Sequence, residues 1–226
     1  MHRDRLIAMI AALGGSSTRD LCRACAEVLG VSGAGISVIG AAGSEPLCAS
    51  DSTAARIEEL QYTLGEGPCV EAHARRGPVA EPDLGGDAGA RWPGFRAGAL
   101  AAGAAAVFAF PLRVGAVRIG SLTVYQDAPG PLTDDQHRDA LAMAEVAVHE
   151  LLVAQAGDAT GGTADRLAAL GAYRAEVHQA SGMISVQLDV SVAEGLVRLR
   201  AHAFREGRPL ADVAADVVAH RIRLER

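Results

Sequence analysis

The sequence predicts an α+β domain followed by a small all-helical domain, and three features indicate this fold class. Two apolar runs rich in β-branched residues lie close together in the middle of the chain, which is typical of a hairpin of central strands. Stretches with helical spacing of apolar residues lie on both sides of them. After residue 163 every apolar pattern is helical. We therefore expect an antiparallel sheet flanked by helices in residues 1–155 and a three-helix bundle in residues 164–226.

The first domain alternates between helical and strand patterns. The run GISVIG at 35–40 is bounded by glycines and predicts a strand, and the hairpin strands are expected at 104–112 and 117–125. Thr133 is the expected N-cap of a long closing helix, with Gln136 three residues later. Helical spacing predicts the earlier helices at 6–13, 18–29 and 53–64.

The segment AGDATGGT, residues 156–163, is composed of small residues and predicts a linker between the two domains. The charge changes at the same place. Residues 1–162 contain 12 arginines and 19 acidic residues, a net charge of −7, whereas residues 163–226 contain 9 arginines and 8 acidic residues, a net charge of +1. An acidic domain and an arginine-rich tail indicate two units with different roles.

The tail contains three expected helices. The first has apolar residues at alternating steps of three and four, a seam that predicts pairing with another helix and with a second subunit. Arg174 and Ser181 occupy the two remaining positions of this seam. The second helix begins after Ser191, which forms a capping box with Glu194, and ends near Gly207. The third helix follows Pro209.

The composition excludes several mechanisms, because the chain contains no lysine and all 21 basic residues are arginine. A P-loop, a pyridoxal phosphate Schiff base and a serine–lysine acylation site each need a lysine. No run reaches about 18 apolar residues, so no membrane span is expected. The start of the chain lacks the apolar core of a signal peptide, and we expect a cytoplasmic protein.

Four cysteines are present, at positions 22, 25, 48 and 69. Cys22 and Cys25 form a C-x-x-C in a helical stretch, where two small thiols on one face are commonly buried. A zinc site would need further ligands at metal spacing, so no metal site is expected. A redox role for these cysteines is left open. In a cytoplasmic protein we expect no structural disulfide.

The tail resembles an ANTAR domain, the RNA-binding antiterminator module of bacterial regulators. The resemblance rests on the stretch from AYRAEVHQASG to LADVAADVV, including Leu199, Arg200 and Ala203. Two positions depart from the family pattern: Ser181 stands where a lysine is common, and Gly195 stands where an alanine is common. The first change removes a cation that meets phosphate, and the second weakens a helix by about 1 kcal/mol.

The front domain resembles a GAF domain, a small-molecule-sensing α+β fold. The residues that carry this resemblance are LGEGPCVEA, DLGGDAGARWPGF, FPLRVGAVRIGSLTVY and the closing helix. The resemblance implies a ligand pocket but does not identify the ligand. The order of the two domains is similar to that of GAF–ANTAR regulators from GC-rich bacteria.

RNA recognition needs cations for phosphate and planar groups for exposed loop bases. The tail supplies candidates on its first two helices, although arginines in this pattern are also typical of a solvated helix surface. Tyr173 is a candidate stacking residue or a core residue. The candidate RNA-binding residues are Arg174, His178, Ser181, Gly182, Arg198, Arg200, Arg205 and Arg208.

In the front domain the candidate ligand-pocket residues are Glu66, Cys69, Asp83, Trp92 and Phe95. The alternative is that the glycines and proline of GEGPC shape a turn, that Cys69 is packed in the core and that the two aromatic residues are core residues. Aromatic residues are scarce in this chain, and their concentration in this region favours a pocket.

We expect a cytoplasmic RNA-binding regulator in which the sensor controls a dimeric antiterminator. The resemblance implies that the target is a pair of short RNA hairpins overlapping a transcription terminator, bound by a dimer. The apolar seam predicts that the homodimer forms through the first tail helix. No catalytic residue, cofactor or membrane partner is expected. One alternative is a DNA-binding transcription factor with a helix-turn-helix. Another is a thiol-dependent GAF-type reductase that uses Cys69 with Cys48 or Cys22.

Overall fold

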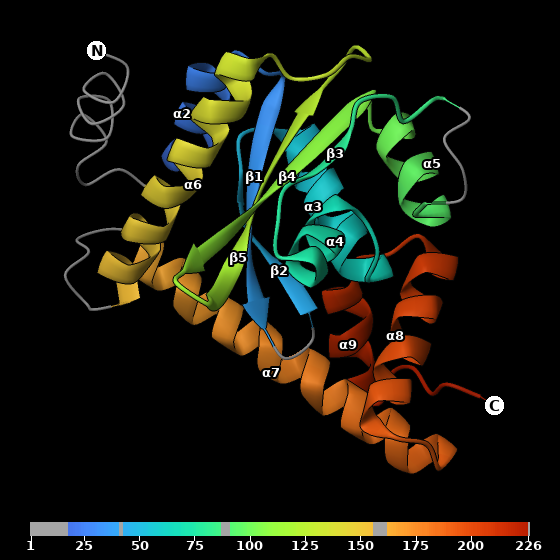
Figure 1. The fold of residues 1–226 in the computed structure, drawn as a ribbon. Coiled ribbons are helices and arrows are strands. Elements are labelled where there is room, and N and C mark those ends of the chain that lie inside the picture. The colour runs from blue at the N-terminus through green and yellow to red at the C-terminus, as the bar shows by residue number, and fades with distance from the viewer. Residues whose placement is uncertain (1–17, 41–42, 87–90, 156–161, 226) are drawn as a thin grey trace.

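The computed structural model describes residues 18–40, 43–86, 91–155 and 162–225, and Figure 1 shows how their elements are arranged. They form an antiparallel sheet with the strand order β2-β1-β5-β4-β3. The strands are β1 (Gly33–Gly40), β2 (Gly43–Ala49), β3 (Val79–Glu81), β4 (Ala106–Val114) and β5 (Val117–Gln126). The α+β fold class and the antiparallel sheet expected from the sequence are confirmed.

The β4–β5 hairpin lies near the centre of the sheet, as the two apolar runs predicted, and its register pairs Phe108 with Val124 and Leu112 with Gly120. The glycine-bounded run forms β1, which pairs with β5. The sequence did not predict the edge strands β2 and β3. Strand β2 contains Glu45 and Pro46, and proline is tolerated at an edge because an edge strand leaves some of its N–H groups unpaired.

Two helices, α2 (Thr18–Leu29) and α6 (Asp134–Gln155), cover one face of the sheet and close the main hydrophobic core with residues such as Phe108, Phe110 and Met143. The predicted cap of α6 is confirmed. The Thr133 hydroxyl accepts from the N–H of Gln136 at 3.2 Å, and the Thr133 N–H donates to Oε1 of Gln136 at 2.9 Å. The helix expected at 6–13 lies outside the described residues.

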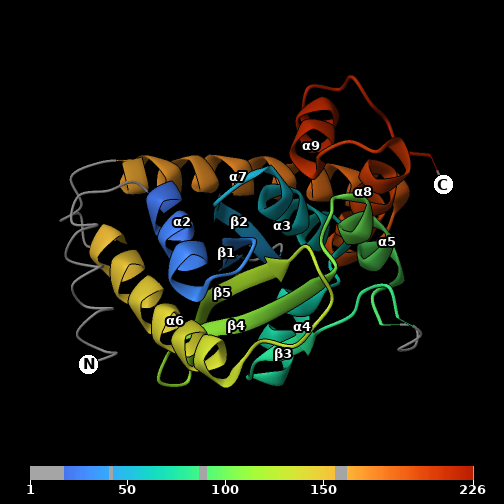
Figure 2. The same cartoon turned by 90° about the horizontal axis from the view of Figure 1, so that it is seen from above.

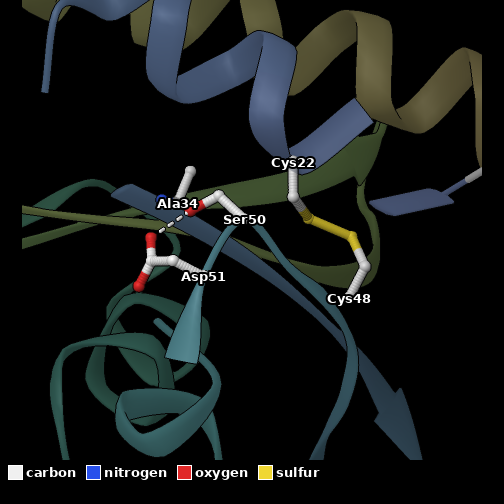
Figure 3. Close-up of a disulfide and its surroundings, with 5 residues drawn as sticks. All are labelled: Cys22, Ala34, Cys48, Ser50 and Asp51. Atoms are coloured by element: carbon white, nitrogen blue, oxygen red, sulfur yellow. Dashed lines mark hydrogen bonds between the residues drawn. A yellow bond between two sulfur atoms is a disulfide. The ribbon is translucent and has the colours of Figure 1, made fainter. Parts of the chain in front are cut away.

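A disulfide joins Cys22 of α2 to Cys48 of β2 (Figure 3). It ties the helix layer to the edge strand of the sheet. Next to it, the hydroxyl of Ser50 accepts from the N–H of Ala34 at 2.9 Å and donates to Asp51. The expectation that no disulfide forms was therefore wrong, because folding brings together two cysteines that are 26 positions apart in the sequence.

On the opposite side of the sheet, α3 (Ser52–Leu64) and α4 (Pro68–Arg75) cover its face, and α5 (Pro93–Ala101) packs against α3. Asp51 caps α3 by accepting from the N–H of Ala54 at 2.9 Å. Gly65 ends the helix in a left-handed conformation with φ 65°. The sequence had indicated α3, whereas α4 and α5 are shorter than the windows over which helical spacing is recognisable.

The tail forms α7 (Gly162–Leu188), α8 (Val192–Glu206) and α9 (Leu210–Val218), the three helices that the sequence predicted. Helix α7 runs along the side of the first domain, and α8 and α9 pack near its C-terminal end and near α3 (Figures 1 and 2). Most of the expected linker lies outside the described residues. Within the part of the chain that is described, no helix is both long and apolar enough to cross a membrane.

Close packing of α7 and α8 explains Gly195. A Cβ built at this position would lie 2.5 Å from the backbone oxygen of Ser181, too close for any side chain. The glycine therefore lets the two helices approach each other. The sequence had indicated a weakened helix at this position, and the structure supplies the packing reason for the residue.

Candidate nucleic-acid interface

Helix α8 carries most of the candidate cations, and its two ends are fixed by local hydrogen bonds. The hydroxyl of Ser191 accepts from the N–H of Glu194 at 3.1 Å, as the capping box predicted. At the other end Gly207 has φ 62°, and the N–H of Arg208 donates to the carbonyl of Ala203 at 3.0 Å. These bonds fix the length of α8 and the place where the chain turns toward α9.

Arg198 and Arg205 lie seven residues apart on an exposed face of α8, with side chains 48% and 69% exposed. Arg198 pairs with Glu194 at 3.2 Å, and Arg205 pairs with Glu206 at 3.3 Å. Exposed pairs of this kind contribute about 0–1 kcal/mol, so a phosphate can replace the carboxylate at little cost. Both arginines are therefore available to an anionic partner.

Arg208 is held in the turn before α9. Its guanidinium pairs with Asp216 at 2.6 Å, and Asp216 also pairs with Arg221 at 2.6 Å. The hydrogen bonds from Arg208 and Arg221 lower the pKa of the Asp216 carboxyl. The two arginines thus gather at the C-terminal end of α9, where cations are also favoured by the helix dipole.

Arg200 points in a different direction from Arg198 and Arg205. Its guanidinium lies against the first domain, where a Cβ built on Gly65 would be 2.6 Å from Nη1 and one built on Gly43 would be 3.0 Å from Nη2. Both glycines have positive φ. The structure therefore divides the candidate arginines of α8 between an open face and a face that packs on the sheet domain.

The candidates on α7 differ in their exposure. His178 is exposed, whereas Ser181 is 1% exposed and its hydroxyl donates to the carbonyl of Val177 at 2.7 Å. The Ser181 hydroxyl is therefore buried within the bundle. Gly182 lines an open groove between α7, α9 and the residues after α9. The side chains of Tyr173 and Arg174 lie outside the described residues.

Two exposed apolar residues of α8 were not singled out in the sequence. Phe204 is 52% exposed and Val197 is 60% exposed, and they lie seven residues apart, beside the open arginine face. An exposed aromatic ring among arginines is suited to stacking on an unpaired base. The sequence could have indicated them, because Val197 and Phe204 are apolar residues that do not belong to the buried seam of Leu199 and Ala203.

The candidate ligand-pocket residues of the first domain have structural partners. Glu66 accepts from the N–H groups of Gly94 at 2.8 Å and Phe95 at 2.9 Å, so it caps α5. Trp92 and Phe95 make an edge contact with ring centroids 6.0 Å apart and share a buried cluster with Cys69. Asp83 is exposed and accepts from the N–H of Gly85. The structure brings the first four together around α5 and leaves Asp83 outside.

A buried polar cluster lies between α3 and the sheet, and the sequence did not indicate it. We call it the Glu58 cluster; its members are Ser37, Ser44, Glu58, Gln61 and Thr123. Gln61 holds it to α4, because its Oε1 accepts from the N–H of Cys69 at 2.7 Å. A Cβ on Gly35 would lie 2.7 Å from Cγ of Glu58, so a glycine in β1 makes room for this side chain.

Burial raises the pKa of Glu58 to about 7. Hydrogen bonds with Thr123 and Ser37 lower this pKa, but their effect is smaller than that of burial. Among the described residues Oε2 of this carboxyl has no hydrogen-bond partner, and the side chain is almost fully buried. A carboxylic acid in this setting gains or loses its proton near neutral pH.

The cysteines do not form a reactive thiol pair. Cys69 is fully buried, and burial raises the pKa of its thiol, the opposite of what a nucleophilic thiolate needs. Cys22 and Cys48 are bonded to each other, so neither is available to Cys69 as a thiol partner. Among the described residues no group of three or more metal-ligating side chains comes together.

The fold and these surfaces define a two-part protein, in which an α+β domain packs against an arginine-bearing helical bundle. Residues 165–218 match the family model of the ANTAR domain. The first domain has the GAF fold, and it precedes the segment that matches the ANTAR model.

Two solved structures support the fold of the first domain. The GAF domain of the phosphoenolpyruvate-protein phosphotransferase from Acinetobacter aligns with a TM-score of 0.53 at 13% identity, covering 70% of this chain and 94% of that one. The corresponding GAF domain from Coxiella burnetii aligns with a TM-score of 0.51, with the same identity and the same coverage. At this identity the similarity concerns the fold alone. No curated protein matches the chain in sequence.

Proposed function

We propose that the protein is a cytoplasmic RNA-binding regulator of transcription antitermination, in which the GAF domain controls the ANTAR domain. The observation that carries the proposal is the open face of α8, which presents Arg198, Arg205 and Phe204 on a bundle that matches the ANTAR family. Arginine suits phosphate and base edges, and an exposed phenyl ring suits an unpaired loop base. Two short hairpins in a nascent transcript offer both kinds of group.

The sensory input acts on the GAF core between α3 and the sheet. The Glu58 cluster supports this assignment, because it places inside the domain a buried carboxyl group, one oxygen of which has no hydrogen-bond partner among the described residues. A small molecule or a proton that changes the cluster would act directly on α3.

The protein acts as a homodimer through α7. Val186 on this helix is 86% exposed, and next to it Gly182, Met183, Val217 and Ile222 line an open groove of about 870 Å³. A second α7 would cover this apolar surface, and a dimer matches a target with two hairpins. Light scattering at tens of micromolar should give a dimer, which Val186→Glu weakens and Val117→Glu, at an exposed site on β5, does not. A monomeric wild type would contradict the dimer.

The direct test of the RNA proposal is binding of the full chain to three nucleic acids: a two-hairpin RNA, the same RNA with both loops replaced, and a duplex DNA of equal length. Tight binding to the first alone is expected. Phe204→Leu should weaken it by roughly 1–3 kcal/mol, the range for loss of a base stack, while Val197→Ala changes little. Equal affinity for all three nucleic acids would contradict the proposal.

Preference for the DNA would instead support a helix-turn-helix transcription factor. The structure disfavours that outcome, because α9 buries Leu210, Val213, Ala214 and Val217 and carries the acidic side chain of Asp212 on its exposed side. A recognition helix needs donors that reach base edges in the major groove.

A further inference from the structure

Helix α3 belongs to both domains. On the sheet side it carries Glu58 and Gln61 of the Glu58 cluster. On the other side it carries Tyr62, which is fully buried and is part of the hydrophobic core of the ANTAR bundle together with residues such as Leu199 and Val213. The bundle core is therefore completed by a side chain of the GAF domain.

Glu59 makes a second link between α3 and the bundle. Helix α9 begins after Pro209, which provides no side-chain cap. The N–H of Leu210, the first residue of α9, instead donates to Oε1 of Glu59 at 3.3 Å. A carboxylate at a helix N-terminus stabilises free N–H groups and the positive end of the helix dipole. The GAF domain thus provides the cap that α9 lacks in its own sequence.

Arg200 makes the third link. Its guanidinium lies over the backbone at Gly65, directly after α3, and at Gly43, where β2 begins. A side chain at either glycine would take this space. One face of α8 is therefore held by the GAF domain, while the face with Arg198 and Arg205 is open.

We infer that α3 of the GAF domain masks Arg200 from RNA, so that full RNA binding requires α8 to leave α3. This inference rests on the proposed RNA-binding function and describes the regulation of that site. A signal that shifts α3 through the Glu58 cluster raises RNA affinity by releasing Arg200. By linkage, bound RNA in turn weakens the contact between α3 and the bundle.

The substitution Gly65→Asn tests the inference. Asparagine tolerates the left-handed conformation at a helix end, and its side chain would displace the guanidinium of Arg200. We expect this variant to bind the two-hairpin RNA roughly three- to tenfold more tightly, as when a minor competent state becomes dominant. Gly30→Asn is the matched control, because Gly30 has φ +59°, follows α2 and, within the described part of the chain, has no atom within 4 Å of a built Cβ. Its affinity should equal that of the wild type.

Arg200→Ala sharpens the test. In the wild-type background it should change affinity little, because Arg200 is masked; in the Gly65→Asn background it should remove the gain. Wild-type affinity of a folded Gly65→Asn protein, or an equal effect of Arg200→Ala in both backgrounds, would overturn the inference.

Hydrogen exchange on the wild-type chain provides a measurement that does not depend on any variant. When the two-hairpin RNA binds, the amide of Leu210 should exchange faster, because its acceptor Glu59 moves away. Slower or unchanged exchange with RNA bound would overturn the inference even if Gly65→Asn fails to fold. Absence of RNA binding by every protein would overturn the proposed function, and the masking inference with it; RNA binding that is insensitive to α3 overturns the masking alone.

Discussion

At Gly195 the packing of two helices requires a glycine, although helix propensity favours alanine at such a position. Replacement of a mid-helix glycine by alanine usually stabilises a helix by about 1 kcal/mol. Here the added methyl would meet the backbone oxygen of Ser181 at 2.5 Å. Because backbone cannot move aside cheaply, we expect Gly195→Ala to destabilise the protein by about 1–3 kcal/mol, as overpacking does. Thermal unfolding followed by circular dichroism measures the effect.

Gly182 provides the control for this prediction. It also lies inside a helix of the bundle, but a Cβ there would have no atom of the described residues within 4 Å. Gly182→Ala should therefore increase the free energy of unfolding by up to about 1 kcal/mol, the gain in helix propensity, and raise the melting temperature. If both substitutions stabilised the protein, the close approach of α7 and α8 would not be the reason for Gly195.

Glu58 predicts a pH dependence of stability. Its pKa is raised from 4.5 to about 7 in the folded protein, so the folded state holds a proton that the unfolded state has released. The stabilising contribution is therefore fully present below pH 4.5 and is lost as the pH rises toward 7, by up to about 1.4 kcal/mol per pH unit. Glu58→Gln resembles the protonated acid and should lack this loss.

Urea unfolding at a series of pH values measures this difference. The stability of Glu58→Gln relative to the wild type should grow between pH 4.5 and 7. Glu145→Gln removes an exposed carboxyl group from α6. Its free energy of unfolding should differ from that of the wild type by the same amount at each pH. A constant offset between Glu58→Gln and the wild type would show that Glu58 does not titrate in this range.

The disulfide between α2 and β2 predicts that stability depends on redox conditions. A cross-link between positions separated by 26 residues restricts the unfolded chain and stabilises a fold by about 3 kcal/mol. We expect a reductant to lower the free energy of unfolding of the wild type by about this amount. The double variant Cys22→Ala with Cys48→Ala should be less stable and insensitive to reductant.

Cys25 is the matched control, because it is a buried free cysteine on the same helix. Cys25→Ala should keep the response to reductant. A wild type that unfolds identically with and without reductant would show that the bond does not stabilise the fold.

Among the elements, those with a strong local pattern were predictable from the sequence. The central hairpin, the cap of α6 and the capping box of α8 each depend on residues within a few positions of one another. Strand β2 and the Cys22–Cys48 bond depend on pairing across the fold. Their sequences, GSEPLCA among them, contain no periodicity that indicates the partner.

The candidate site was predictable to a similar extent. The sequence identified the arginines of α8, but not that Arg200 faces the GAF domain while Arg198 and Arg205 face outward. That division depends on how α3 and α8 pack together. The Glu58 cluster was missed for the same reason, since its polar residues come from four separate elements.

Because α3 contributes to two hydrophobic cores, the whole molecule should unfold as one unit. Tyr62 lies in the bundle core, while Ile57 and Leu60 of the same helix lie in the core beneath the sheet. We expect a single calorimetric transition for the wild type. Tyr62→Ala removes about 3–5 kcal/mol of packing from the bundle, the range for a large aromatic residue, and should split the transition into two.

Phe95→Ala separates this coupling from a general loss of stability. Phe95 is also fully buried, but its cluster contains residues of the GAF domain alone. This variant should melt at a lower temperature and still show one transition, because the link through Tyr62 is intact. Two transitions in the wild type, or in Phe95→Ala, would mean that the domains fold independently. In that case α3 would transmit no signal from the GAF core to the bundle.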